Sequence, residues 1–162
     1  MADIKLSGGE KLMSALAKIA EGMGGGRVDI GFKAGAAYPD GTPVAAVAFW
    51  NEFGDPSRNR PPRPFFRQMI AKESPDWPSK MSKLAKATGY DGAQVLGMMG
   101  ADVAGALTQS INEFTTPGLA MSTILARAAR YKKGEVIGPT IAKPLIDTKV
   151  MLDNITSTVE ME

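Results

Sequence analysis

Cysteine and histidine are both missing from the 162 residues of this sequence. Without cysteine no disulfide framework can form, and the chain fits a reducing compartment. The usual protein ligands of zinc, haem and iron–sulfur clusters are absent, and Ser-His-Asp and Cys-His catalysis are excluded. Acid–base catalysis at neutral pH would need a carboxylate or lysine with a strongly shifted pKa. These absences predict a protein that is not an enzyme and binds no cofactor or metal.

Long apolar runs are also missing. The longest, Val44–Trp50, is about a third of the roughly 20 residues that span a bilayer, and the N-terminus does not resemble a signal peptide.

The formal net charge of +2 argues against a dedicated DNA-binding protein, which needs many phosphate contacts. With 44% hydrophobic residues the chain suits one globular domain, made in the cytoplasm.

Apolar periodicity predicts the main elements. A helix is expected at Gly9–Met23, ended by the following glycines, and a long helix at Ala93–Phe114. Alternating polar and apolar residues predict strands at Arg27–Lys33 and Ile155–Glu162, which we expect to pair. Shorter helices are predicted at Val44–Phe53, from Pro64 through Ile70, at Ser79–Thr88 and at Ser122–Tyr131, with a turn at Val150–Leu152.

These elements predict an α+β fold in which a small antiparallel sheet packs with several helices in a single domain, residues 1–162. Residues 1–25 would form an N-terminal helix, and residues 132–144 a flexible loop. A third strand is needed, either from a hairpin at Ala34–Thr42 or from a neighbouring subunit.

Several residues are typical of helix starts. Thr42 is expected to be an N-cap with Pro43 as the first helical residue, and Pro64 is expected to begin the next helix. Thr148 is expected to be the N-cap of the turn after it. Asp147 is expected to bond local backbone N–H groups, although a carboxylate pair with Asp153 in a small hydrolase is an alternative.

The glycines at 22 and 24–26 do not form a phosphate loop, because no strand precedes them and no Lys-Ser or Lys-Thr pair comes after them. A helix cap explains them better. Within the long helix, Gly97, Gly100 and Gly105 either allow close helix contact or are simply tolerated.

The loop Asp55–Pro64 is rich in proline and arginine and lies between large apolar residues, Trp50 and Phe53 on one side and Phe65 and Phe66 on the other. It is either an interface, since arginine and aromatic residues are enriched at interface centres, or a surface loop anchored by core aromatics. We expect the aromatics in the core and the arginines outside. The arginines expected to contact a neighbouring subunit or another protein are Arg58, Arg60, Arg63 and Arg67.

A basic stretch that contains no acid consists of Arg127, Arg130, Lys132 and Lys133. A solvated face is the simplest interpretation. The alternative is contact with DNA or an acidic partner, which would make the chain a monomeric DNA-binding accessory protein.

The run Val44–Gly54, together with Pro61–Arg67 a short loop later, resembles a tailed-phage neck family whose members are called tail-completion, virion morphogenesis or minor tail component proteins. In that family an apolar helix ends in Asn/His-Glu-Phe-Gly, and a Pro-Arg-Pro-Phe helix start comes next. The strand Val28–Phe32 also fits. The residues on the pattern are Trp50, Glu52, Phe53, Gly54, Pro64 and Phe65.

A second run, Lys143–Thr148, resembles the family's Pro-Leu-Asp-Thr-Gly segment, and Met151–Ile155 resembles the family's entry into its next strand. Pro144, Asp147 and Thr148 match, whereas Lys149 stands where the family usually has glycine. The resemblance spans about residues 26–159.

The resemblance implies a structural protein of the virion with no catalytic residues, assembled in the host cytoplasm. Its copies would form a ring, commonly of six, at the head–tail junction. Other neck and tail-tube proteins would be its partners, DNA would pass through the lumen without sequence recognition, and no membrane would be involved. A ring needs two different contact surfaces on each subunit. We expect the loop Asp55–Pro64 and an exposed strand edge to supply them.

Overall fold

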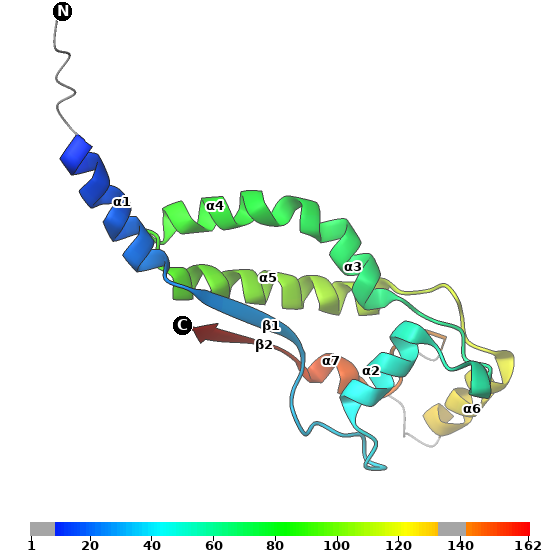
Figure 1. The fold of residues 1–162 in the computed structure, drawn as a ribbon. Helices are drawn as coiled ribbons and strands as arrows, with labels where there is room; N and C mark the ends of the chain where they lie inside the picture. The colour runs from blue at the N-terminus through cyan, green and yellow to red at the C-terminus, as the bar shows by residue number, and fades with distance from the viewer. Residues whose placement is uncertain (1–8, 133–141) are drawn as a thin grey trace, which may run out of the picture.

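The computed structural model describes residues 9–132 and 142–162, and it confirms an α+β fold (Figure 1). The helices and strands are α1 (Gly9–Met23), β1 (Gly26–Phe32), α2 (Val44–Phe53), α3 (Phe65–Glu73), α4 (Trp77–Ala87), α5 (Gly92–Glu113), α6 (Met121–Lys132), α7 (Val150–Asp153) and β2 (Ile155–Met161). None of the helices in this part of the chain is both long and apolar enough to cross a membrane. Most of the expected flexible loop, residues 133–141, lies outside the described residues.

The sheet has two strands in the described chain, and the predicted pairing is confirmed. β1 and β2 are antiparallel, with Gly26 opposite Met161 and Phe32 opposite Ile155. The hairpin expected to provide a third strand forms only one isolated bridge, between Ala37 and Pro43. A turn occupies this segment instead, in which the Tyr38 N–H donates to Thr42 O at 2.8 Å. The prediction of a third strand from the hairpin was therefore wrong for this part of the chain.

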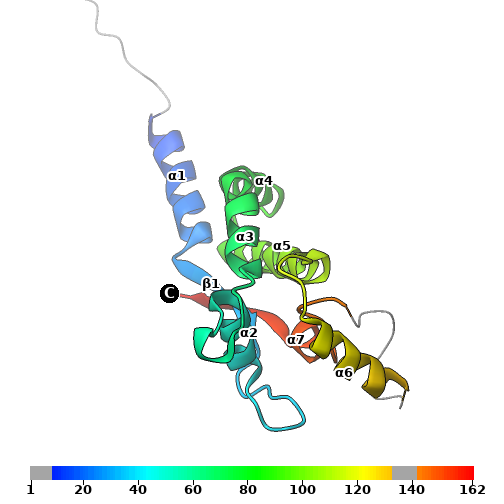
Figure 2. The same cartoon turned by 90° about the vertical axis from the view of Figure 1, so that its right-hand side faces the viewer.

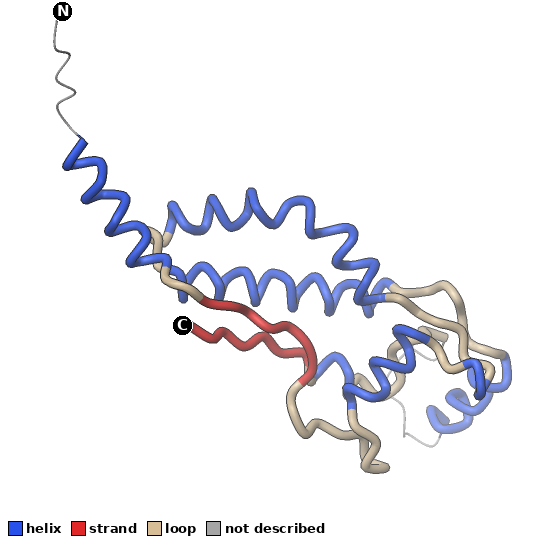
Figure 3. Tube along the Cα trace, in the orientation of Figure 1, coloured by secondary structure: helices blue, strands red, loops and turns tan. Residues whose placement is uncertain are grey.

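Helix α5 is the centre of the fold. It lies between the layer of α3 and α4 and the sheet, as the traces in Figures 1 and 3 show. The apolar residues that recur at helical spacing along it are Leu96, which is half-buried, and Met99, Val103, Leu107 and Ile111, which are all buried. The buried core contains Val44, Ala48, Phe65, Met69, Met99, Val103, Leu107, Ile111, Phe114, Leu145, Ile146 and Met151.

Helix α1 points away from the body of the molecule (Figures 1 and 2). Its bounds agree with the prediction, and Gly24 comes after it in the left-handed region, with φ 55°. The apolar side chains of its first turns are not covered in the chain alone, because Leu12 is 61% exposed and Leu16 is 49% exposed. Its C-terminal end lies close to the start of α5, where Gly22 faces the carbonyl of Tyr90 and Met23 lies against Gly92.

Several helix starts differ from the predictions by one or two residues. Pro43 and Pro64 are the N-cap residues of α2 and α3, not the first helical residues. Helix α4 begins at Trp77 and not at Ser79, because the missing N–H of Pro78 falls in the first turn, where no intrahelical partner is needed. The predicted apolar face of α3 is only partly buried, since Ile70 is 38% exposed.

The glycines of α5 separate into two kinds, which gives a test of the packing. A Cβ on Gly100 would lie 2.8 Å from Val28 Cγ2 and 3.0 Å from Ser157 Cβ, whereas nothing lies within 4 Å of one on Gly97 or Gly105. We expect Gly100→Ala to destabilise the protein by about 1–3 kcal/mol. Gly97→Ala and Gly105→Ala should each stabilise it by up to about 1 kcal/mol. Urea unfolding of the three variants would measure this, and equal effects at all three positions would contradict the close contact.

Candidate functional site

The residues that carry the family resemblance meet at the joint between α2 and α3, and Glu52 is at its centre. The Glu52 carboxylate is buried and accepts hydrogen bonds from the backbone N–H groups of Phe66, at 2.9 Å, and Arg67, at 3.1 Å. It also receives the Arg67 Nε at 2.8 Å. These N–H groups belong to the first turn of α3, which favours negative charge. A side chain of α2 therefore caps α3 in place of Pro64, which has no capping side chain.

Gly54 ends α2 in a conformation that no other residue fits. Its φ is 78°, and a Cβ would lie 2.8 Å from both the carbonyl oxygen of Arg60 and the nitrogen of Pro62. The loop after it is closed by reciprocal backbone hydrogen bonds between Asp55 and Arg60, at 2.9 and 3.0 Å. The loop is thus held at both ends and presented in a fixed shape.

The three arginines of the loop and Arg67 of α3, all expected to contact a partner, differ from one another. Arg63 is buried, and its guanidinium donates to the carbonyl oxygens of Pro117 and Gly118, both at 3.3 Å. Burial lowers the pKa of Arg63, and the neighbouring charges of Arg127 and Arg60 lower it further. The expectation that Arg63 points outward is therefore wrong. The sequence does not distinguish it, because its partners lie more than fifty positions away along the chain.

Arg58, Arg60 and Arg67 do lie at the surface. The Arg58 guanidinium is 5.8 Å from the ring centroid of Trp50, which is half-buried, and pairs with Asp55 at 3.6 Å. The Arg67 guanidinium is 4.9 Å from the ring centroid of Phe53. Both contacts are cation–π arrangements, which hold the two cations beside aromatic rings.

Phe53 is not in the core, contrary to expectation, and Phe49 beside it is exposed as well. Phe49 is 59% exposed and Phe53 is 52% exposed, with ring centroids 4.7 Å apart, whereas Phe65 is fully buried. The two rings border a surface hollow of about 280 Å³. The residues that line it are Phe32, Ala48, Phe49, Glu52, Phe53, Phe65, Phe66 and Arg67. We call this the aromatic surface. The rings of Phe49 and Phe53 are exposed because Val44, Ala48 and Glu52 form the side of α2 that faces the core.

The second set of family-like residues forms a separate cluster around the two arginines of α6. Arg127 is buried, and its NH1 donates to the carbonyl oxygens of Lys143, at 2.7 Å, and Ile146, at 2.9 Å. Asp147 receives Arg130 at 2.6 Å and lies 3.6 Å from Arg127. Burial lowers the pKa of Arg127, and Asp147 opposes that shift. A solvated face was therefore the wrong prediction for Arg127, and local backbone capping was wrong for Asp147.

The segment leading to β2 also differs from its predicted capping. Thr148 does not cap α7: the N-cap is Lys149, which has φ 62°, in the left-handed region that favours glycine. Pro144 is buried. Asp153, the other half of the considered carboxylate pair, is exposed, whereas Asp147 is bound to arginines. The side chains of Lys132 and Lys133 lie outside the described residues.

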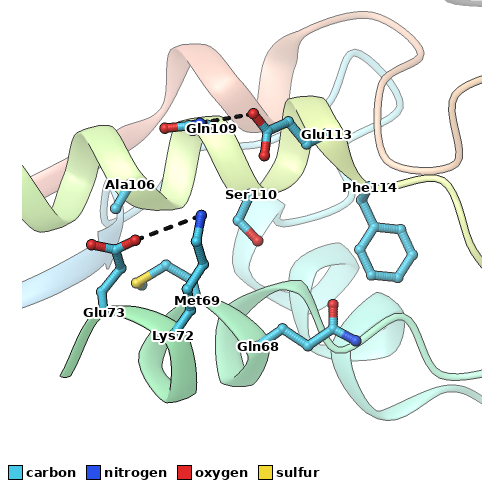
Figure 4. Close-up of a pocket in the computed structure, with 9 residues that line it drawn as sticks. All are labelled: Gln68, Met69, Lys72, Glu73, Ala106, Gln109, Ser110, Glu113 and Phe114. Atoms are coloured by element: carbon cyan, nitrogen blue, oxygen red, sulfur yellow. Dashed lines mark hydrogen bonds and ion pairs between the residues drawn. The ribbon is translucent and has the colours of Figure 1, made fainter. Parts of the chain in front are cut away.

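A groove of about 190 Å³ runs between α3 and α5 (Figure 4). Its polar groups bond mainly with one another: Gln109 donates to Glu113 at 2.7 Å, and Lys72 lies 3.7 Å from Glu73. Ser110 donates to the carbonyl oxygen of Phe65 at 2.7 Å. In the described residues, no group of acidic side chains is arranged to hold a metal ion. The Ser110 hydrogen bond links α5 to α3 across the groove. Among the described residues that line the groove, no side chain is placed to act as a catalyst.

The aromatic surface is therefore the strongest candidate site, and it is suited to binding another protein. It combines exposed phenylalanine rings with arginines held in place, which are the residue types enriched at interface centres. No protein-family model matches the chain, and neither the curated proteins nor the solved structures include a match.

Proposed function

We propose that this protein is a structural subunit of the head–tail junction of a tailed-phage virion, where its copies form a ring that joins or ends the tail. The ring would contain six copies, with DNA passing through its lumen. Neck and tail-tube proteins would be its partners. The observation that carries the proposal is the aromatic surface, an exposed apolar patch beside a loop whose shape is fixed by Gly54 and by the Asp55–Arg60 pair.

Two details of the backbone support the resemblance on which the proposal rests. Gly54 stands where only glycine fits, as the family pattern requires. Lys149, which replaces the family's usual glycine, has φ 62°, so the position has the conformation that glycine favours. At both positions, therefore, the backbone conformation explains why the family pattern has glycine.

The role in the virion can be tested with a phage that carries a stop codon early in this gene. Electron microscopy of the lysate should show separate DNA-filled heads and free tails, or tails of abnormal length. A plasmid copy of the wild-type gene should restore intact particles. Intact virions in normal numbers without the gene would refute the proposal and favour the DNA-binding alternative, which salt-sensitive DNA binding by the purified protein would support.

The same complementation can test the aromatic surface. The double variant Phe49→Ser/Phe53→Ser should unfold near the wild-type temperature, because both rings are more than half exposed, yet fail to restore infectious particles. The matched control is Met121→Ser/Leu125→Ser on α6, whose side chains are 67% and 63% exposed. We expect this control to restore them. Full restoration by the aromatic variant would remove the surface from the proposal.

A further inference from the structure

Helix α1 has an apolar side that the described part of the chain leaves uncovered. Its side chains Leu12, Met13 and Leu16, which we call the α1 stripe, are between 49% and 67% exposed. Isolated helices of up to about 12–15 residues are only marginally stable in water, and α1 has 15 residues. Because α1 also points away from the body of the molecule (Figures 1 and 2), it needs a partner that buries the stripe.

The aromatic surface has the shape and the chemistry to receive this stripe. Five of the six phenylalanines in the chain line its hollow. At about 280 Å³ the hollow is smaller than most small-molecule pockets, which measure roughly 300–1,000 Å³. Leucine and methionine side chains suit it, since methionine makes favourable contacts with aromatic rings. An amphipathic helix that lays its apolar side into an apolar groove is a recurring mode of protein recognition.

The stripe cannot reach the aromatic surface of its own chain. Helices α1 and α2 lie at opposite ends of β1 (Figures 1 and 2), and Phe32, the last residue of β1, lines the hollow. The seven residues of β1 span about 20 Å at roughly 3.3 Å each. The stripe lies about 10–15 Å further along α1, at roughly 1.5 Å per residue. Within one chain the two features are thus about 30–35 Å apart.

We infer that the α1 stripe of each copy docks on the aromatic surface of a second copy of this chain. The contact is heterologous, since a helix meets a hollow, and it leads to a ring when the rotation closes. Helix α1, in place of the strand edge expected from the sequence, then supplies the second contact surface of the subunit. The inference rests on the proposed ring and names the partner of its aromatic surface.

Charge supports this pairing. Glu10 and Glu21 are eleven residues apart, about three helical turns, and lie on one flank of the stripe. The two lysines of α1 lie on the opposite side of the helix, away from the stripe. From Glu52 to Arg67 the chain has four arginines and two acids. The Arg67 side chain, which lines the hollow, is 56% exposed. An acidic flank of the helix therefore meets a basic rim of the hollow.

The spacing of such contacts agrees with the proposed ring. Neighbouring copies would be about 30–35 Å apart, the distance between the stripe and the aromatic surface in one chain. Six copies at that spacing have their centres on a circle about 60–70 Å across, because a hexagon is twice as wide as its side. A chain of 162 residues has a radius of gyration of about 15 Å. The circle therefore leaves an opening through which DNA can pass.

The inference can be tested by mixing two variants of the full chain. Leu12→Gln/Leu16→Gln removes the stripe but keeps a high helix propensity, and Phe49→Ser/Phe53→Ser removes the aromatic surface. In sedimentation velocity neither variant should self-associate at concentrations at which the wild type does. Their equimolar mixture should form dimers and nothing larger, because each mixed pair retains one intact contact. Amide hydrogen exchange should show α1 protected in the mixture but not in either variant alone.

Lys11→Gln/Lys18→Gln, on the polar side of α1, is the matched control and should associate as the wild type does. Circular dichroism checks that each variant folds. A mixture that stays monomeric while the wild type associates would overturn the inference, and so would wild-type association by either test variant. A wild type that is monomeric at every concentration tested would also overturn it and leave the aromatic surface to another virion protein.

The docking and the neck role can fail separately. A monomeric mixture together with detached heads and tails in the stop-codon phage would overturn the docking alone. Dimers in the mixture together with intact virions would overturn the neck role alone.

Discussion

Replacing Glu52 with alanine is expected to lower the free energy of unfolding by about 3–5 kcal/mol, because it removes a buried carboxylate that accepts three hydrogen bonds. The buried carboxylate accepts from two backbone N–H groups of α3 and from Arg67. Hydrogen bonds to a charged group contribute about 1.5–3 kcal/mol each. Their loss would leave the N–H groups of the first turn of α3 without a protein acceptor, because Pro64 provides no substitute.

Thermal and urea unfolding would measure the effect of Glu52→Ala. In a chain of this size about 3 kcal/mol corresponds to a fall in Tm of roughly 6–12 °C. Glu52→Gln should be intermediate, because it keeps one acceptor oxygen but loses the charge. Glu113→Ala removes an exposed glutamate that accepts a hydrogen bond from Gln109 on the same helix, and should change stability by less than about 0.5 kcal/mol. Equal stability of the Glu52 and Glu113 variants would show that the joint does not depend on this carboxylate.

The joint shows what periodicity can and cannot predict. The end of α2 was predicted from its apolar run and from Gly54, and Phe65 was placed correctly in the core. The exposure of Phe49 and Phe53 was not predicted. A run that is apolar on all sides does not reveal which side faces the core. The capping role of Glu52 was missed for a related reason, since its partners lie fourteen and fifteen positions away.

The arginines illustrate a second limit. Composition treats Arg58 and Arg63 as equivalent members of one loop, but only Arg63 reaches carbonyl oxygens beyond α5. A guanidinium can donate to several carbonyl groups that have no partner in a helix or strand. An arginine beside an irregular segment can therefore be buried, because it bonds the carbonyl groups of that segment. The sequence would have to reveal where Pro117 and Gly118 lie in space before this role could be predicted.

The strands show the opposite case. Alternation predicted both strands and their pairing, because a strand's period is a local property. The expectation of a third strand came from the small number of strands in a helix-rich chain, and no sequence pattern supported it. The structure places no third strand in the described chain.

Helix α6 is held against the rest of the protein by Arg127 more than by apolar packing. None of its described apolar residues belongs to the buried core, and Met121 and Leu125 are exposed. Arg127 instead donates to Lys143 O and Ile146 O and lies beside Asp147. Replacing it with methionine would keep a long side chain but remove every donor.

Arg127→Met is therefore expected to lower the free energy of unfolding by about 3–5 kcal/mol, since it leaves Asp147 and two carbonyl groups without this cation. Arg130→Met, one turn away, removes a pair whose arginine side chain is 41% exposed, and should cost no more than about 1 kcal/mol. Hydrogen exchange would locate the change, because α6 should lose protection in Arg127→Met while α5 keeps it. Similar losses in both variants would mean that α6 is held by net charge, whereas unchanged protection in both would mean that its backbone contacts suffice.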